Sequence, residues 1–116
     1  MLKLQEVPEL GSNENGYYRK WPDGTLECWG ISTVPLKSTT AWKNGLYYDY
    51  NDVAIRYPIE FLDSPVINIS VRNNVFLTVS LYTTYKTGIN SVIVYSGDSY
   101  STHNCECYWY AIGRWK

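Results

Sequence analysis

The sequence has little charge and no long hydrophobic run. Charged residues make up 18% of the chain, and ten basic residues against eleven acidic ones give a formal charge of −1 without any basic run. This balance lacks the electrostatic footprint of a nucleic-acid binder. No segment approaches the roughly 18 apolar residues of a membrane span, and the first ten residues have neither the basic start nor the apolar run of a signal peptide. We therefore expect a soluble protein without a visible export signal, with no nucleic-acid partner and no membrane insertion.

Cysteine and histidine are scarce as well. The three cysteines form an odd set, and a strand would point Cys105 and Cys107 the same way, without the geometry for a bond between them. Reduced thiols are expected, although a disulfide between Cys28 and one of that pair stays open if their strands are neighbours. With the lone His103 the pair supplies fewer than the four ligands of a structural zinc site. A zinc shared across a symmetry axis stays open, but the sequence predicts no metal and no cofactor.

What the sequence has in abundance is aromatic residues with a polar edge. Twelve Tyr and five Trp stand against only two Phe, within an aromatic content of 16%. Rings of this kind suit surfaces that are wet or shared with a partner better than they suit a dry core. We therefore expect an exposed or intermolecular aromatic surface.

Period-two alternation dominates the chain, and no window of 11 residues has apolar positions at helical spacing. The pattern predicts an all-β protein. A hairpin turn is expected at Pro22-Asp23-Gly24, because Pro presets φ for the turn and Asp-Gly accepts the positive φ that follows. A strand from Asp52, with Val53 and Ile55 on its apolar face, should end near Tyr57 or lie at an edge of its sheet, since Pro58 follows. With 116 residues, the chain predicts one domain, an antiparallel β-sandwich of about six to seven strands.

Two further runs, 67–71 and 75–81, alternate in the same way. If they are direct neighbours, a three-residue loop from Arg72 to Asn74 keeps their apolar faces together, whereas a two-residue turn mixes the faces. The expected pairs are Val71 with Val75, Ile69 with Leu77, and Ile67 with Val79. Asn74 then takes the left-handed position of the loop.

The last part of the chain should contain a strand covered on both faces, from Ile89 to Ser96 after the break at Gly88, and then a polar loop from Gly97 to Asn104. The final strand follows, with Cys105, Cys107, Trp109, Ala111, Gly113 and Trp115 on one face. The small residues among these indicate that something large packs over them. Four tryptophans are expected to be structural: Trp21, Trp29, Trp109 and Trp115.

Residues 1–15 are interpreted as a leader or the stub of an upstream segment, and residues 16–116 as the β-sandwich domain. Where the leader meets the domain, residues 11–16 are rich in turn formers and predict a joint.

The candidate ligand site centres on the segment from Trp42 to Tyr50. A ring presented at a loop can lie against the C–H face of a sugar while neighbouring polar groups bind its hydroxyls. The candidate residues are Trp42, Asn44, Tyr47, Asp49, Tyr50, Asp52, Tyr100 and His103. The alternative, that these rings pack between protomers, stays open, most evenly for Tyr47 and Tyr48.

Catalytic patterns are weak. A glycosidase needs two facing carboxylates at about 5–9.5 Å, and the sequence fixes no such distance for Asp49, Asp52 or Asp63, which are expected to be turn and strand-end residues. His103 has no nucleophile at a recognisable spacing and is placed in an exposed loop. We therefore expect no enzyme.

Two terminal segments, YRKWPDGTLECWG (residues 18–30) and AIGRWK (residues 111–116), look like the C-terminal module of phage and prophage tail-fibre or minor structural proteins. Between them the chain resembles the H-type lectin pattern, in YPIEF (residues 57–61), Pro65-Val66, Thr87-Gly88-Ile89 and WYAIG (residues 109–113). The chain departs from the animal H-type lectins in lacking a clear His/Arg/Asp sugar-contact set. Sugar specificity therefore cannot be transferred.

This resemblance implies an H-type-lectin-like sandwich that assembles as a homotrimer at the tip of a tail fibre. The virion would be its location, after assembly in the cytoplasm of the bacterial host, and its partner a bacterial surface polysaccharide or another surface receptor. The alternative function is a purely structural cap that trimerises a fibre and binds nothing.

Overall fold

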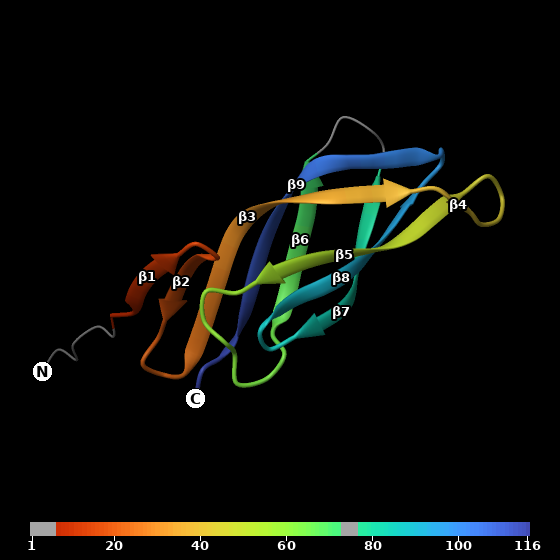
Figure 1. The fold of residues 1–116 in the computed structure, drawn as a ribbon. Helices are drawn as coiled ribbons and strands as arrows, with labels where there is room; N and C mark the ends of the chain where they lie inside the picture. Colours follow the sequence, from red (N-terminus) through yellow and green to blue (C-terminus); the bar gives the residue numbers. More distant parts are fainter. Residues whose placement is uncertain (1–6, 73–76) are drawn as a thin grey trace, which may run out of the picture.

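The structure is a computed structural model that describes residues 7–72 and 77–116. These residues form two antiparallel sheets (Figure 1). One sheet has the order β1-β2-β3-β9-β6 and the other the order β4-β5-β8-β7. The strands are β1 (Glu9–Asn13), β2 (Gly16–Lys20), β3 (Thr25–Ser38), β4 (Thr40–Ala41), β5 (Tyr47–Arg56), β6 (Val66–Arg72), β7 (Thr78–Tyr85), β8 (Gly88–Ser96) and β9 (Tyr100–Arg114). The all-β antiparallel sandwich is confirmed, and among the described residues no helix occurs that could span a membrane.

The strand count differs from the expected six to seven, because nine strands occur in the described residues. Two of the additional strands, β1 and β4, are short and carry no apolar alternation that would have predicted them. The predicted extent of the turn-rich joint, residues 11–16, is wrong. β1 pairs with β2 from Glu9 to Asn13, and Gly16 already belongs to β2. The sheet therefore begins within the stretch interpreted as a leader.

The predicted hairpin at Pro22-Asp23-Gly24 is confirmed. Gly24 has φ +103°, and its N–H donates to the Trp21 carbonyl at 3.0 Å. The C-terminal segment packs on this turn, because the Trp115 N–H donates to the Gly24 carbonyl at 2.9 Å and the Trp115 indole donates to the Trp21 carbonyl at 2.7 Å. The two ends of the chain that carried the resemblance thus lie side by side.

The register expected if the runs 67–71 and 75–81 were direct neighbours does not occur, because the two runs lie in different sheets. β6 pairs with β9 and β7 pairs with β8, so Ile69 stands opposite Trp109 and not opposite Leu77, and Ile67 stands opposite Ala111. The two runs do present their apolar residues to the same core, but from different sheets. The expected pair Val71 with Val75 and the conformation of Asn74 lie outside the described residues.

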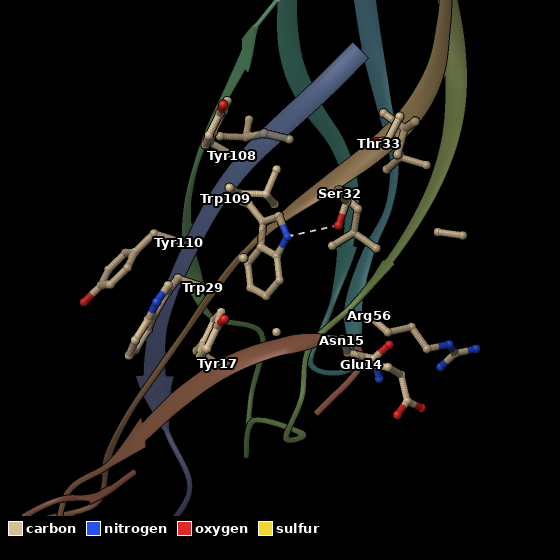
Figure 2. Close-up of a pocket in the computed structure, with 18 of the residues that line it drawn as sticks. Glu14, Asn15, Tyr17, Trp29, Ser32, Thr33, Arg56, Tyr108, Trp109 and Tyr110 are labelled. Carbon is tan, nitrogen blue, oxygen red and sulfur yellow. Dashed lines mark hydrogen bonds between the residues drawn. The ribbon is translucent and has the colours of Figure 1, made fainter. Parts of the chain in front are cut away.

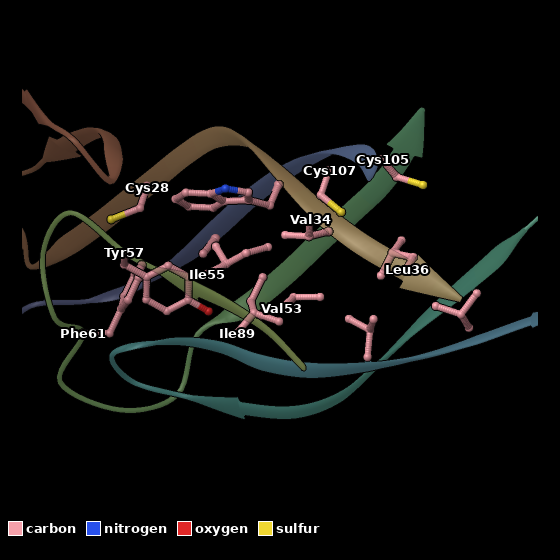
Figure 3. Packing of buried hydrophobic residues seen from close by; sticks show 14 of the residues in the cluster. Cys28, Val34, Leu36, Val53, Ile55, Tyr57, Phe61, Ile89, Cys105 and Cys107 are labelled. Carbon is pink, nitrogen blue, oxygen red and sulfur yellow. The ribbon is translucent and has the colours of Figure 1, made fainter. Parts of the chain in front are cut away.

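The core lies between the two sheets, as Figure 3 shows. β5 contributes Val53 and Ile55, and Tyr57 and Phe61 follow it in the loop before β6. β5 ends at Arg56, as Pro58 predicted, and β8 is largely buried between its two neighbours, as expected. Gly113 leaves room for Phe61, whose ring would lie 2.9 Å from a Cβ at that position. The expectation of a large group over the small residues of β9 is therefore confirmed there.

The three cysteines are buried and free, as expected. β3 and β9 are neighbours, but their register sets Cys28 opposite Ala111 and Cys107 opposite Ser32. Burial raises the pKa of the Cys28 thiol to about 12 and that of Cys107 to about 11. Thiols held protonated in this way are poor nucleophiles and poor metal ligands.

Trp109 joins the two layers, and its side chain is only 3% exposed. Its indole lies against Gly30 and Gly16, where an added Cβ would come within 2.8 Å and 3.2 Å of the ring. On the other side its ring centroid lies 5.6 Å from that of Tyr57. Its Nε1–H donates to Ser32 Oγ at 3.3 Å. The structural role expected of this tryptophan is confirmed.

Replacing Trp109 with alanine should lower the free energy of unfolding by about 3–5 kcal/mol, because the lost indole leaves a cavity between the sheets. Urea denaturation followed by circular dichroism measures the change. Trp42→Ala is the matched control: this ring is 57% exposed, and its loss should cost less than about 0.5 kcal/mol. Equal losses for the two variants would contradict the placement of Trp109.

Candidate functional site

Four rings form a continuous series on the outer face of the four-stranded sheet: Trp42, Tyr48, Tyr50 and Tyr82, here called the aromatic row. Successive ring centroids are 6.1, 5.9 and 4.8 Å apart. Period-two alternation on β5 points Tyr48 and Tyr50 outward, and β7 supplies Tyr82 from the far side of β8. Trp42, Tyr50 and Tyr82 are each more than half exposed. The row is thus a shallow, solvent-facing surface.

The turn before β5 fixes the position of Trp42. The segment expected to be a loop is a hairpin between β4 and β5, closed by a hydrogen bond from the Trp42 N–H to the Leu46 carbonyl at 2.8 Å. Asn44 and Gly45 have φ of +56° and +74°, the left-handed region that Asn and Gly accept. Asn44 is exposed in this turn, and the Lys43 ammonium lies 5.2 Å from the centre of the Trp42 ring.

Asp49 points away from the aromatic row. Its carboxylate accepts hydrogen bonds from the Thr39 N–H at 2.6 Å and from the Thr39 and Thr40 hydroxyls, each at 2.9 Å. Burial alone would raise the pKa of Asp49, but these hydrogen bonds outweigh burial and hold the pKa below its usual value. The side chain ties β5 to the link between β3 and β4, and its oxygens are already occupied.

The other β5 candidates divide between the two faces. Tyr47 alternates with Tyr48, so it lies on the opposite face of the strand from the row. Asp52 is exposed on the same face as Tyr50, and its carboxylate has no hydrogen-bond or ion-pair partner among the described residues. Asp52 is therefore the candidate carboxylate that is free to meet a ligand beside the row.

Tyr100 and His103 lie on the other sheet. The expected polar loop through Asn104 is wrong in length, because β9 already begins at Tyr100. The His103 ring is half-buried, with its centroid 6.4 Å from that of Tyr100, and its Nδ1–H donates to the Ser101 carbonyl at 2.9 Å. The structure thus brings these two candidates together, but not with the aromatic row. In the described ranges, 7–72 and 77–116, no three His, Cys, Asp or Glu residues are grouped as metal ligands.

A groove of about 1230 Å³ was missed by the sequence analysis (Figure 2). We call it the edge groove, because it follows one edge of β3 from Gly30 to Val34. The turn between β1 and β2 and residues 53–56 of β5 form its other sides, and Trp109 lies in its floor. Alternation predicts which face a side chain takes but not where a strand loses its neighbour, so no pattern in the sequence indicated this groove.

The outer face of the five-stranded sheet carries a set of exposed apolar residues, here called the apolar face: Leu10, Tyr17, Ile31, Val66 and Ile112. Register places them on adjacent strands, with Leu10 opposite Arg19, Glu27 opposite Ile112, and Ile112 opposite Val66.

The charges within the apolar face are neutralised internally. The Glu27 carboxylate lies 3.0 Å from Arg19 Nε and accepts the Trp21 indole N–H at 2.7 Å and the Tyr110 hydroxyl. Burial would raise the pKa of Glu27, but the hydrogen bonds from Tyr110 and Trp21 and the Arg19 charge together lower it. The face therefore combines exposed apolar groups with an ion pair, a composition typical of protein interfaces.

No protein-family model and no curated protein matches the chain. Among solved structures, the chain is similar to the R1 pyocin fibre of P. aeruginosa, in a structure that comprises C-terminal residues 323–701 of that protein. The TM-score is 0.56 and the sequence identity 20%, over 91% of this chain and 28% of that one. At this identity the likeness shows a shared fold, and this chain spans about 28% of the length of the fibre fragment.

Replacing Asp49 with asparagine should destabilise the protein by about 1–3 kcal/mol, because the hydroxyl and amide donors of Thr39 and Thr40 lose a charged acceptor. The lowered pKa of Asp49 means that its contribution is present above the usual carboxylate pKa and is lost as the pH falls through the folded-state pKa. Thermal unfolding from pH 7 to pH 3 should therefore show a smaller decrease for the variant than for the parent. Asp52→Asn is the control and should leave the profile unchanged; identical profiles for the two variants would contradict the anchoring role.

Proposed function

We propose that this chain is a non-enzymatic domain at the tip of a tail fibre, which binds a glycan on a bacterial surface and acts as a homotrimer. The aromatic row is the observation that carries the proposal. The fold shared with a pyocin fibre fragment supports the fibre setting. In this proposal the domain belongs to a virion and is assembled in the cytoplasm of the bacterial host.

The chemistry of the aromatic row suits a saccharide. An exposed ring offers its flat apolar face to the C–H groups of a sugar, and a tyrosine hydroxyl can both donate and accept a hydrogen bond. Tyr50 and Tyr82 lie in contact with a centroid distance of 4.8 Å, which makes a platform wider than one ring. Asp52 and Asn44 flank the row with polar groups that have no hydrogen-bond partner among the described residues and can bind sugar hydroxyls.

A shallow site of this kind binds a ligand weakly. Several copies of the site in one assembly can compensate for the weak affinity of each. Three copies held in one assembly convert the second and third contacts into intramolecular events, which raises the apparent affinity without new contacts. The apolar face supplies a surface through which copies can associate. It lies on the five-stranded sheet, so association there leaves the aromatic row of the other sheet open to solvent.

The second candidate function is a structural cap that ends a fibre and binds nothing. The apolar face favours it as much as it favours the first, because both functions need the chains to associate. The aromatic row distinguishes them, since a cap has no use for a series of exposed rings outside the interface.

Tyr50→Ala should weaken binding of the full chain to the surface polysaccharide of a susceptible bacterium by about tenfold, which corresponds to a contact of about 1.4 kcal/mol. Surface plasmon resonance on immobilised polysaccharide measures the change. Tyr85→Ala is the matched control, because Tyr85 is a tyrosine of equal exposure on β7, at 55% against 56%, outside the row. Equal affinity of the two variants, or an assembled chain that binds no bacterial surface, would favour the structural cap.

Val66→Glu should shift the chain from trimer to monomer, because it places a charge in the most exposed apolar position of the apolar face, at 71% exposure. Multi-angle light scattering counts the chains in each variant. Tyr85→Glu adds the same charge to the other sheet and should leave the trimer intact. A parent chain that stays monomeric at high concentration would overturn the trimer.

A further inference from the structure

The edge groove contains main-chain groups that lack a strand partner. Among the described residues, β2 pairs with β3 only as far as Trp29, so this edge of β3 has no neighbouring strand from Gly30 onward. The main-chain N–H and C=O groups of successive residues in a strand point to alternate edges of that strand. On β3 the main-chain groups of Pro35 and Lys37 face the open edge. Ile31 and Thr33 share that orientation, so their N–H and C=O groups face the groove.

Both ends of this open edge are closed by the protein itself. At one end the Asn51 side chain substitutes for a strand, accepting the Lys37 N–H and donating to the Lys37 carbonyl, each at 3.0 Å. At the other end Gly16 begins β2 opposite the Trp29 region. The open edge is therefore short, with two residues available for pairing.

The wall opposite the aromatic side chains is polar and held in place. The turn between β1 and β2 carries Glu14 and Asn15, and it is anchored by Asn13 Nδ2, which donates to the Pro58 carbonyl at 3.0 Å. Arg56 lies near this turn at the end of β5, as Figure 2 shows. Neither Glu14 nor Arg56 forms an ion pair within the described ranges.

The β5 segment that brings Arg56 to the groove is irregular. The register between β5 and β8 shifts between Asp52 and Ile55, and Ala54 has φ +49°, a left-handed conformation that is unfavourable for alanine. Bulges and strained residues of this kind re-aim side chains and concentrate at functional sites. Here the irregularity lies in the wall of the edge groove.

We propose that the edge groove is a second saccharide-binding site of the chain, separate from the aromatic row. This inference rests on the proposed function and names a further site for the same class of ligand. The partly exposed ring of Trp29 offers the apolar contact. Arg56 and Glu14 bind hydroxyls by charge-assisted hydrogen bonds, and the main-chain groups of Ile31 and Thr33 complete the set.

A saccharide fits this groove better than an extended peptide does. A peptide that adds to a sheet edge draws its affinity from a run of main-chain hydrogen bonds, and this edge offers only two residues before Pro35 interrupts it. A saccharide needs no regular run. It uses scattered donors and acceptors beside aromatic faces, which is what the two walls provide.

The test is a titration of the ¹⁵N-labelled full chain with short bacterial oligosaccharides selected on a glycan array. The indole N–H signals of Trp29 and Trp109 report on the edge groove, and that of Trp42 reports on the aromatic row. We expect a binding saccharide to shift the groove signals, and Arg56→Gln and Glu14→Gln each to weaken that response by about tenfold or more. Lys37→Gln, which removes an exposed charge of β3 outside the groove, should leave it unchanged.

The outcomes separate the two proposals. A saccharide that shifts Trp42 alone overturns the groove site and leaves the proposed function standing. A groove response that is unaffected by Arg56→Gln and Glu14→Gln also overturns the inference, as does a response to an extended peptide without one to any saccharide. If no saccharide on the array binds the chain, the proposed function and the groove site both fail.

Discussion

The packing of Trp109 is the constraint on which the rest of the structure depends. Its indole lies against two positions without a side chain, Gly16 on β2 and Gly30 on β3, and a Cβ at Gly30 would come within 2.8 Å of the ring. The Trp109 ring also contacts the Tyr57 ring, and so it connects the five-stranded sheet to the loop that follows β5. The same two glycines line the edge groove, and Trp109 lies in its floor. The side chain of Trp109 therefore belongs both to the core of the sandwich and to the floor of the edge groove.

The sequence predicted the strands well and their partners less well. Alternation placed Val53, Ile55 and the inward face of β9 correctly, because burial on one face imposes a period of two. It could not tell that β6 and β7 lie in different sheets, since two runs with matching apolar faces can meet a core either as neighbours or from opposite layers. The thiols of Cys28 and Cys107 show the same limit, because adjacent strands bring them to one core but register keeps them apart.

The candidate site was predicted in part for similar reasons. Trp42 and Tyr50 do lie exposed in one surface, but Tyr82 joins them from β7, and no local pattern links residues so distant in sequence. Asp49 could have been assigned to the inner face from its alternation with Tyr50. Its carboxylate is held by Thr39 and Thr40, a contact that depends on how β3 passes into β4. The aromatic surplus that composition indicated thus divides into an exposed row, a groove and an apolar face.

The separation of the aromatic row from the apolar face is the basis of the proposed function, because association through one sheet leaves the row on the other sheet open. Adsorption of the full chain to a panel of bacterial strains, before and after periodate oxidation of the cells, tests this most directly. Periodate cleaves vicinal diols of sugars, so the account predicts adsorption to some strains that periodate abolishes and protease treatment of the cells preserves. Adsorption that survives periodate and disappears with protease would contradict it, as would the absence of adsorption to every strain.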